Sequence, residues 1–312
     1  MSAATDRYYV IIGSGAVRTF SAIGCLRAGH RVTVVDPGQP GGEQASSYGN
    51  AGWLSSHSVI PPAEPGMWKK APSFLLDPLG PLSIRWDYLP KELPWLTRFL
   101  WAARTTAQIE RTAQAMRTLL IDAPKLHASL ASEAGVSQLI GRRGVLHVYP
   151  DRTAFEGDAR SWAIRRKVGV EWLELTAEAL RQREPDLHLR YTFGLLVEEA
   201  GHCRDPGNSI AALSELARER GAIDITTRAT GFRHERGRLT AVATEQGEIA
   251  CNSAVVAAGA RSKALTTSLG DRLPLESERG YHVMVTDPEV GPRTPMMASE
   301  IPLAPFDPRC CL

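Results

Sequence analysis

Residues 8–36 read YYVIIGSGAVRTFSAIGCLRAGHRVTVVD, and this stretch decides the fold. The apolar run at residues 8–12 predicts a buried parallel strand, and residues 19–28 have helical character. A second apolar run at residues 31–35 predicts another strand, which ends in Asp36. The order of strand, glycine-rich turn, helix and strand predicts the opening unit of a Rossmann-like α/β domain.

The turn between the first strand and the helix suits a dinucleotide. Gly13 permits a tight turn, and Gly15 lets the backbone approach a pyrophosphate. The helix that begins here offers free N–H groups and the positive end of its dipole. Asp36 follows Gly15 by 21 residues, the spacing at which a carboxylate accepts hydrogen bonds from a ribose. An NAD-dependent dehydrogenase, and a glycine-rich turn that binds no nucleotide, are the alternatives.

The third glycine of the G-x-G-x-x-G pattern is replaced by Arg18. Glycine stands there because the helix packs closely on the first strand, so an arginine is expected to overpack the contact by ~1–3 kcal/mol and to bury a charge. The alternative is that Arg18 swings outward and pairs with a phosphate. Of the two, the sequence favours damage to the packing.

Composition excludes several classes of function. The chain has 312 residues, 43% of them apolar and 22% charged, with a formal net charge of +2. This balance is ordinary for a globular protein and argues against nucleic-acid binding. Five cysteines form neither a disulfide framework nor a C-x-x-C metal pattern, which suggests a cytoplasmic protein without a metal. We see no signal peptide and no apolar run of the ~18 residues that span a bilayer.

The remaining chain alternates between helical and strand patterns. Residues 37–66 are rich in Gly, Ser, Pro and Asn and predict a loop, whereas residues 96–120 predict one amphipathic helix. The aromatic cluster that precedes and begins this helix could contact a membrane surface or form an inter-helix core, and we favour the core. Further strands are expected at residues 193–197 and 254–258, with a helix at residues 209–220 between them.

An ordered set of segments resembles the FAD-dependent D-amino-acid oxidase superfamily, and most of all its D-amino-acid dehydrogenase (small subunit) branch. The segments are VIIGSGAV with Asp36, SSYGNAGWLS, LLDPLGPLSIRWDYLPKELPWLTRFL, GHCRDPGNSIAAL, AVVAAGARS and LESERGYHVMV. They extend from Tyr8 to Val285. The run at residues 76–100 and the ERGYH segment are more specific to the family than the nucleotide fingerprint is.

The resemblance implies roles for individual residues. Three residues would lie on the substrate side of the flavin. Arg279 would bind the substrate carboxylate, and Tyr281 and His282 would help to roof the substrate pocket. FAD would be held by eleven residues, of which the first five cradle the pyrophosphate, Asp36 binds the ribose and the rest approach the isoalloxazine: Gly13, Ser14, Gly15, Ala16, Val17, Asp36, Asn50, Ala51, Gly52, Ala258 and Gly259.

The implied architecture is a glutathione-reductase-like FAD domain, residues 1–66 and 203–271, interleaved with an α+β substrate domain, residues 67–202 and 272–312. The implied reaction is oxidative deamination of a D-amino acid to a 2-oxo acid and ammonia, by hydride transfer to the flavin. A glycine- or sarcosine-type amine oxidase is the alternative within the superfamily. Electrons would pass to oxygen or to a membrane quinone, the latter with peripheral contact to the inner membrane.

Two features depart from the family pattern. Arg261 stands where relatives often carry an aromatic residue. After Ser299 the sequence no longer resembles the family, and we expect a C-terminal truncation that leaves the substrate domain incomplete. A non-catalytic remnant with weak or no flavin binding is therefore a further hypothesis.

Overall fold

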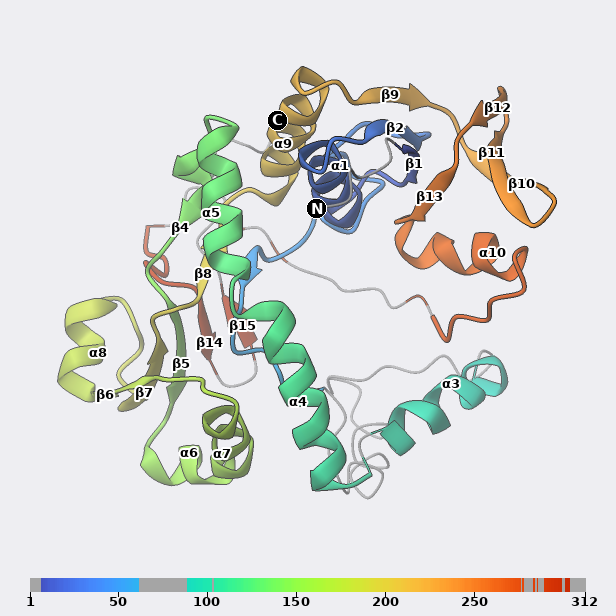
Figure 1. Cartoon of the computed structure of the whole chain (residues 1–312). Coiled ribbons are helices and arrows are strands. Elements are labelled where there is room, and N and C mark those ends of the chain that lie inside the picture. The colour runs from blue at the N-terminus through green and yellow to red at the C-terminus, as the bar shows by residue number, and fades with distance from the viewer. Residues whose placement is uncertain are drawn as a thin grey trace, which may run out of the picture.

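The computed structural model describes residues 7–61, 89–102, 104–275, 277, 283, 285, 289–298 and 301–303. Its first sheet is a parallel one in the order β13-β1-β2-β9. The strands are β1 (Tyr8–Ile12), β2 (Arg31–Asp36), β9 (Ile223–Thr226) and β13 (Ser253–Val256). Helix α1 (Ala16–Arg27) connects β1 to β2 (Figure 1). The predicted Rossmann-like α/β unit is confirmed.

Both faces of this sheet are covered, as its apolar strands require. One face packs on α1, α5 (Ala123–Glu133) and α9 (Pro206–Glu219), with Ile11 and Val34 at the centre of the contact. The other face, which includes Val10 and Val35, packs on an antiparallel sheet of β10 (Ala229–Glu235), β11 (Arg238–Thr244) and β12 (Gly247–Ala250). Successive strand residues therefore alternate between a helical and a sheet-lined core.

A second large sheet is mixed, in the order β15-β14-β5-β7-β6. Its strands are β5 (Val145–Tyr149), β6 (Leu173–Thr176), β7 (Phe193–Val197), β14 (Met296–Ala298) and β15 (Ile301–Leu303). One face packs on α8 (Ala177–Arg183) through Leu180, and the other on α7 (Ala159–Lys167) through Trp162.

A small antiparallel sheet, β3-β8-β4, follows the glycine-rich loop. It consists of β3 (Trp53–Leu54), β8 (Gly201–Cys203) and β4 (Ile140–Gly141). Helix α9 begins directly after β8, so the small sheet leads into the helix that covers the parallel sheet. The remaining helical segments are α3 (Leu89–Ala102), α4 (Thr106–Leu120), α6 (Arg152–Gly157), α10 (Ser262–Thr267) and the 3-10 turns Ser137–Leu139 and Gly259–Arg261.

One predicted helix is two helices in the structure. The single helix expected at residues 96–120 is wrong, because α3 ends at Ala102 and α4 begins at Thr106. Thr105 is the cause: its hydroxyl accepts a hydrogen bond from the amide of Gln108 at 3.3 Å and caps a new helix. The apolar periodicity continues through this break, which hides it in the sequence.

Candidate functional site

Gly13 occupies a buried turn at the carboxyl end of β1. Its amide donates to the carbonyl of Val35 at 2.9 Å, and the amide of Ala257 donates to Ile12 at 2.8 Å. Gly13 has φ +135°, and a Cβ added to it would lie far inside van der Waals contact with the carbonyl oxygen of Ala257. The first fingerprint glycine therefore brings the turn against the chain that leads from β13 to Ala258 and Gly259.

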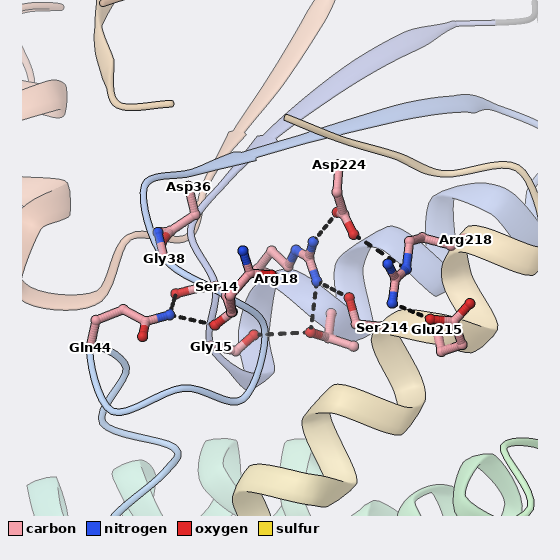
Figure 2. A network of polar contacts seen from close by, with 12 residues as sticks. Ser14, Gly15, Arg18, Asp36, Gly38, Gln44, Ser214, Glu215, Arg218 and Asp224 are labelled. Atoms are coloured by element: carbon pink, nitrogen blue, oxygen red, sulfur yellow. Dashed lines mark hydrogen bonds and ion pairs between the residues drawn. The ribbon is translucent and has the colours of Figure 1, made fainter. Parts of the chain in front are cut away.

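The second glycine lies beneath the loop at residues 37–50. The amide of Ala16, the first residue of α1, donates to Ser47 Oγ at 3.0 Å, and this oxygen would lie 3.2 Å from a Cβ on Gly15. Gln44 Nε2 donates to Ser14 Oγ at 3.2 Å. The loop thus lies against the helix N-terminus (Figure 2). Ser47 is a site residue that sequence reasoning missed; only its place in the small-residue stretch SSYGNAG pointed to it.

Two polar residues, Asp36 and Thr227, stand at the carboxyl ends of the neighbouring strands β2 and β9. Asp36 is half-buried and accepts a hydrogen bond from the amide of Gly38 at 2.8 Å. It pairs in register with Thr226. The next residue, Thr227, is 4% exposed, and its hydroxyl has no hydrogen-bond partner in the described part of the chain. Thr227 belongs to no motif, so sequence reasoning could not single it out.

Asn50, Ala51 and Gly52 form the entry to β3. Asn50 and Ala51 are exposed, and Asn50 Oδ1 accepts the amide of Gly52 at 2.7 Å. Gly52 has φ +72° and is pressed against β8, since the amide of Cys203 donates to its carbonyl at 2.6 Å. A Cβ on Gly52 would overlap the carbonyl oxygen of Cys203. The glycine is therefore required by the packing of two strands.

Arg18 behaves differently from both expectations. Its side chain is 3% exposed, donates to Ser214 Oγ on α9 at 2.5 Å and forms an ion pair with Asp224 on β9 (Figure 2). The predicted packing damage is wrong, because the side chain leaves the gap between helix and strand sideways, toward α9. Pairing with a phosphate is also wrong, because the guanidinium is buried and both of its terminal nitrogens are bound, to Ser214 and Asp224.

The residues expected on the substrate side are Arg279, Tyr281 and His282, and they lie outside the described residues. Ala258 is half-buried and Gly259 exposed at the end of the β13 segment, while Val17 is exposed in the first turn of α1. Among the described residues, no group of three or more His, Cys, Asp or Glu side chains could hold a metal ion.

A buried polar cluster fixes the segment that follows β3. His57 Nε2 lies 2.9 Å from His147 Nε2 on β5, beside the indole of Trp162. Burial, together with the charges of Arg165 and Arg117, lowers the pKa of His57 from 6.5 to about 3. Burial and the neighbouring His57 hold the pKa of His147 well below 6.5 as well. Both imidazoles are therefore neutral near pH 7.

Acid is expected to destabilise the protein through this pair. The unfolded chain binds protons below about pH 6.5, whereas folded His57 binds one only near pH 3, so the free energy of unfolding falls as pH drops through that window. The slope is at most ~1.4 kcal/mol per pH unit for each histidine. Urea unfolding between pH 4 and pH 7 (roughly the window in which the two states differ in bound protons) measures it.

The double variant His57→Leu/His147→Leu should show a flatter dependence on pH than the native chain. His234→Gln, a change at an exposed histidine of β10, is the control and should keep the native slope. Equal slopes in all three proteins would contradict the assignment of the acid sensitivity to the buried pair.

The sequence matches the FAD dependent oxidoreductase (DAO) family over residues 9–309. The chain belongs to this family. It is 63% identical to a D-amino-acid oxidase of Bradyrhizobium diazoefficiens, over 94% of the chain and 70% of that protein. It is also 32% identical to a D-amino acid dehydrogenase of Paramagnetospirillum magneticum, over 88% of the chain and 66% of that protein.

Solved structures show the same fold at low sequence identity. Glycine oxidase of Bacillus cereus aligns with a TM-score of 0.56 and 20% identity, over 84% of this chain and 58% of its own. L-proline dehydrogenase of P. horikoshii aligns with a TM-score of 0.58 and 19% identity, over 85% of this chain and 56% of its own. The chain spans about two thirds of the curated relatives and under three fifths of these structures.

The comparisons confirm the predicted family, fold class and cofactor, FAD. In the described part of the chain no helix combines the length and the apolarity needed to cross a bilayer.

Proposed function

We propose that this chain catalyses the FAD-dependent oxidative deamination of D-amino acids, with oxygen as the electron acceptor. The observation that carries the proposal is the 63% identity to a D-amino-acid oxidase across 94% of the chain, against 27–32% to the D-amino acid dehydrogenases. At this difference in identity the oxidase is the better guide to the acceptor.

Features of the described residues fit FAD. The Gly13 turn leaves no room for a side chain, and the N-terminus of α1 carries no acidic residue in its first turn. Thr227 follows the residue that pairs in register with Asp36, and its buried hydroxyl, which has no partner in the described part of the chain, is a polar atom that a ligand would satisfy. All of these groups lie at the carboxyl ends of parallel strands, where ligands bind in open α/β sheets.

We assign the roles as follows. The turn at residues 13–17 would cradle the pyrophosphate through those of its backbone amides that do not already donate to Val35 or Ser47, and Asp36 would bind the adenosine ribose. The turn at Asn50–Gly52 and the Ala258-Gly259 pair would flank the isoalloxazine. The first group precedes β3, and the second follows β13, where the neighbouring Ala257 contacts the fingerprint turn at Gly13.

FAD, when bound, supplies the acceptor for the two electrons of the substrate's Cα–H bond, which leave as a hydride. The remaining work belongs to the chain, which must orient Cα and exclude competing reactions. Arg279 is proposed to bind the substrate carboxylate as a bidentate cation, and Tyr281 and His282 to close the pocket over it. Loss of two electrons and two protons gives an imine, which water hydrolyses to the 2-oxo acid and ammonia.

We also propose the division into an FAD domain (residues 1–66 and 203–271) and a substrate domain (residues 67–202 and 272–312). All strands of the parallel sheet and of the antiparallel sheet packed on it come from the first set. The helix α5, which covers the parallel sheet, comes from the second set. All five strands of the mixed sheet come from the second set.

Flavin content and product analysis test the proposal. Purified protein is expected to be yellow and to consume oxygen with D-alanine, giving hydrogen peroxide and ammonia in equal amounts, with L-alanine as the control. Turnover of glycine or sarcosine instead would favour the alternative amine-oxidase reaction. Folded protein that stays colourless after addition of FAD would refute the proposal and support the non-catalytic alternative.

A quinone acceptor with peripheral membrane contact is the second candidate. Leu93 and Trp101 on α3 are 51% and 65% exposed, and Arg104 lies over the Trp101 ring at 3.8 Å. An exposed indole beside cations is typical of a membrane interface. If this candidate holds, the protein floats with anionic lipid vesicles and reduces an acceptor dye without oxygen, and Trp101→Ser abolishes the flotation.

A further inference from the structure

Arg18 is held at a position where three physical effects oppose an arginine. The close approach of α1 to β1 leaves little room for a side chain, burial penalises the charge, and a cation in the first turn opposes the helix dipole. Even so, the side chain is only 3% exposed. Interactions specific to this chain must therefore offset these costs.

The offsetting contacts come from two other elements. The guanidinium donates to Ser214 Oγ on α9 and pairs with Asp224 Oδ1 on β9. Ser214 is 1% exposed, so its hydroxyl depends on this donor. Figure 2 shows Arg18 reaching from α1 toward both partners, with Arg218 of α9 on the far side of Asp224. One side chain thus joins a helix of the fingerprint to a second helix and to the edge strand of the sheet.

The contact of α1 with the sheet stays closed around this side chain. Ile11, Ala22 and Ile23 are at most 1% exposed in the same core. The arginine therefore does not separate the helix from the sheet. With glycine at position 18, the backbones of α1 and β1 would be in direct contact. Here, the polar contacts of Arg18 hold α1 in place instead.

The same tie reaches the adenosine end of the cofactor site. Asp36 and Asp224 project from the same face of neighbouring strands, because Val34 pairs with Asp224 and Asp36 with Thr226. Burial lowers the pKa of Arg18, while the charges of Asp224 and Asp36 oppose that shift. The guanidinium therefore interacts electrostatically with both carboxylates. It connects the N-terminus of α1 to the strand pair β2–β9, which carries Asp36.

We propose that Arg18 is a positioning residue for the ADP half of FAD: it fixes the N-terminus of α1 relative to Asp36 by tying α1 to α9 and β9. The proposal rests on FAD binding as proposed above. Hydrogen bonds from the helix amides to a pyrophosphate weaken steeply when distance or angle changes. Loss of the tie therefore weakens binding of the ADP moiety while leaving the amides themselves in place.

The test measures ADP affinity by calorimetry on the full chain after removal of bound flavin. Arg18→Gly restores the fingerprint glycine, yet we expect at least about tenfold weaker ADP binding, or roughly 1.4 kcal/mol. Arg18→Lys keeps the positive charge, whereas Arg18→Met keeps only the length of the side chain. The ADP affinity of the Lys variant should therefore be closer to the native affinity than that of the Met variant. Arg218→Ala removes the other cation beside Asp224 without touching α1, and it should stay within about twofold of native affinity.

Each outcome of this test either supports or overturns the proposal. Tighter or unchanged ADP binding by Arg18→Gly overturns the proposal, and so do equal affinities of the Lys and Met variants, which would show that packing alone matters. If Arg18→Gly does not fold, the Lys and Met pair gives the answer at a temperature where circular dichroism shows both folded. Native protein that binds ADP but not FAD refutes the proposed function alone. Native protein that binds neither refutes both.

Discussion

Gly13→Ala is expected to abolish flavin binding and to lower the free energy of unfolding by about 2–5 kcal/mol. The backbone at Gly13 has φ +135°, a conformation that costs an L-residue ~1–2 kcal/mol. The new methyl group would also overlap the Ala257 carbonyl, and overpacking of this kind costs ~1–3 kcal/mol. Relief requires the turn to move away from the strand end, which displaces the amides that face the pyrophosphate.

Gly29→Ala is the matched control for this change. Gly29 follows the end of α1 with φ +79°, and a Cβ there meets no atom within 4 Å. It therefore carries the conformational cost of ~1–2 kcal/mol without the overlap. Visible flavin absorbance of the purified proteins and urea unfolding separate the two effects. A Gly13→Ala protein with native flavin content and the stability of the Gly29 control would contradict the role given to this turn.

The sequence predicts the elements whose signals are local. Residues 8–12 and 193–197 are strands with the expected bounds, since each is an apolar run buried on both faces. Helix α9 begins three residues earlier than the predicted residue 209, because Asp205 caps it and Pro206 occupies its first position. The apolar pattern of that helix does not reveal this polar start.

The parts of the site that the sequence misses depend on contacts between distant segments. The fingerprint glycines and Asp36 follow from spacing alone. Ser47 and Thr227 do not, because one is defined by the amide it accepts from Ala16 and the other by its burial. The prediction for Arg18 is wrong for the same reason. The fingerprint alone predicts a clash at this position, because it contains no information about Ser214 of α9 and Asp224 of β9, which bind the side chain.

Arg117→Leu is expected to lower the free energy of unfolding by about 1–3 kcal/mol, the range for leaving buried hydrogen-bonding groups without a partner, because the Glu199 side chain is 33% exposed and stays in contact with water. The Arg117 side chain is 6% exposed and binds both oxygens of Glu199, at 2.6 and 2.9 Å. It also donates to the carbonyls of Ser56 and Gly169. Burial would raise the pKa of Glu199, but the hydrogen bonds from Arg117 and Ser56 outweigh it and lower that pKa. Without Arg117 the carboxylate loses this compensation.

The double variant Arg117→Leu/Glu199→Leu separates the value of the pair from the cost of leaving one charge alone. The carbonyls of Ser56 and Gly169 lose their donor in both variants, so the double variant should recover only the part of the loss that comes from the unpaired Glu199. Lys167→Leu breaks an exposed ion pair with Glu110 and should change stability by less than ~1 kcal/mol. Urea unfolding of the four proteins at pH 7 compares them. Because Arg117 holds the backbone at Ser56, next to the strand that follows Asn50–Gly52, both variants that lack Arg117 should release flavin more readily than the native protein. Equal stability of the native and single-variant proteins would show that this pair does not hold the segment in place.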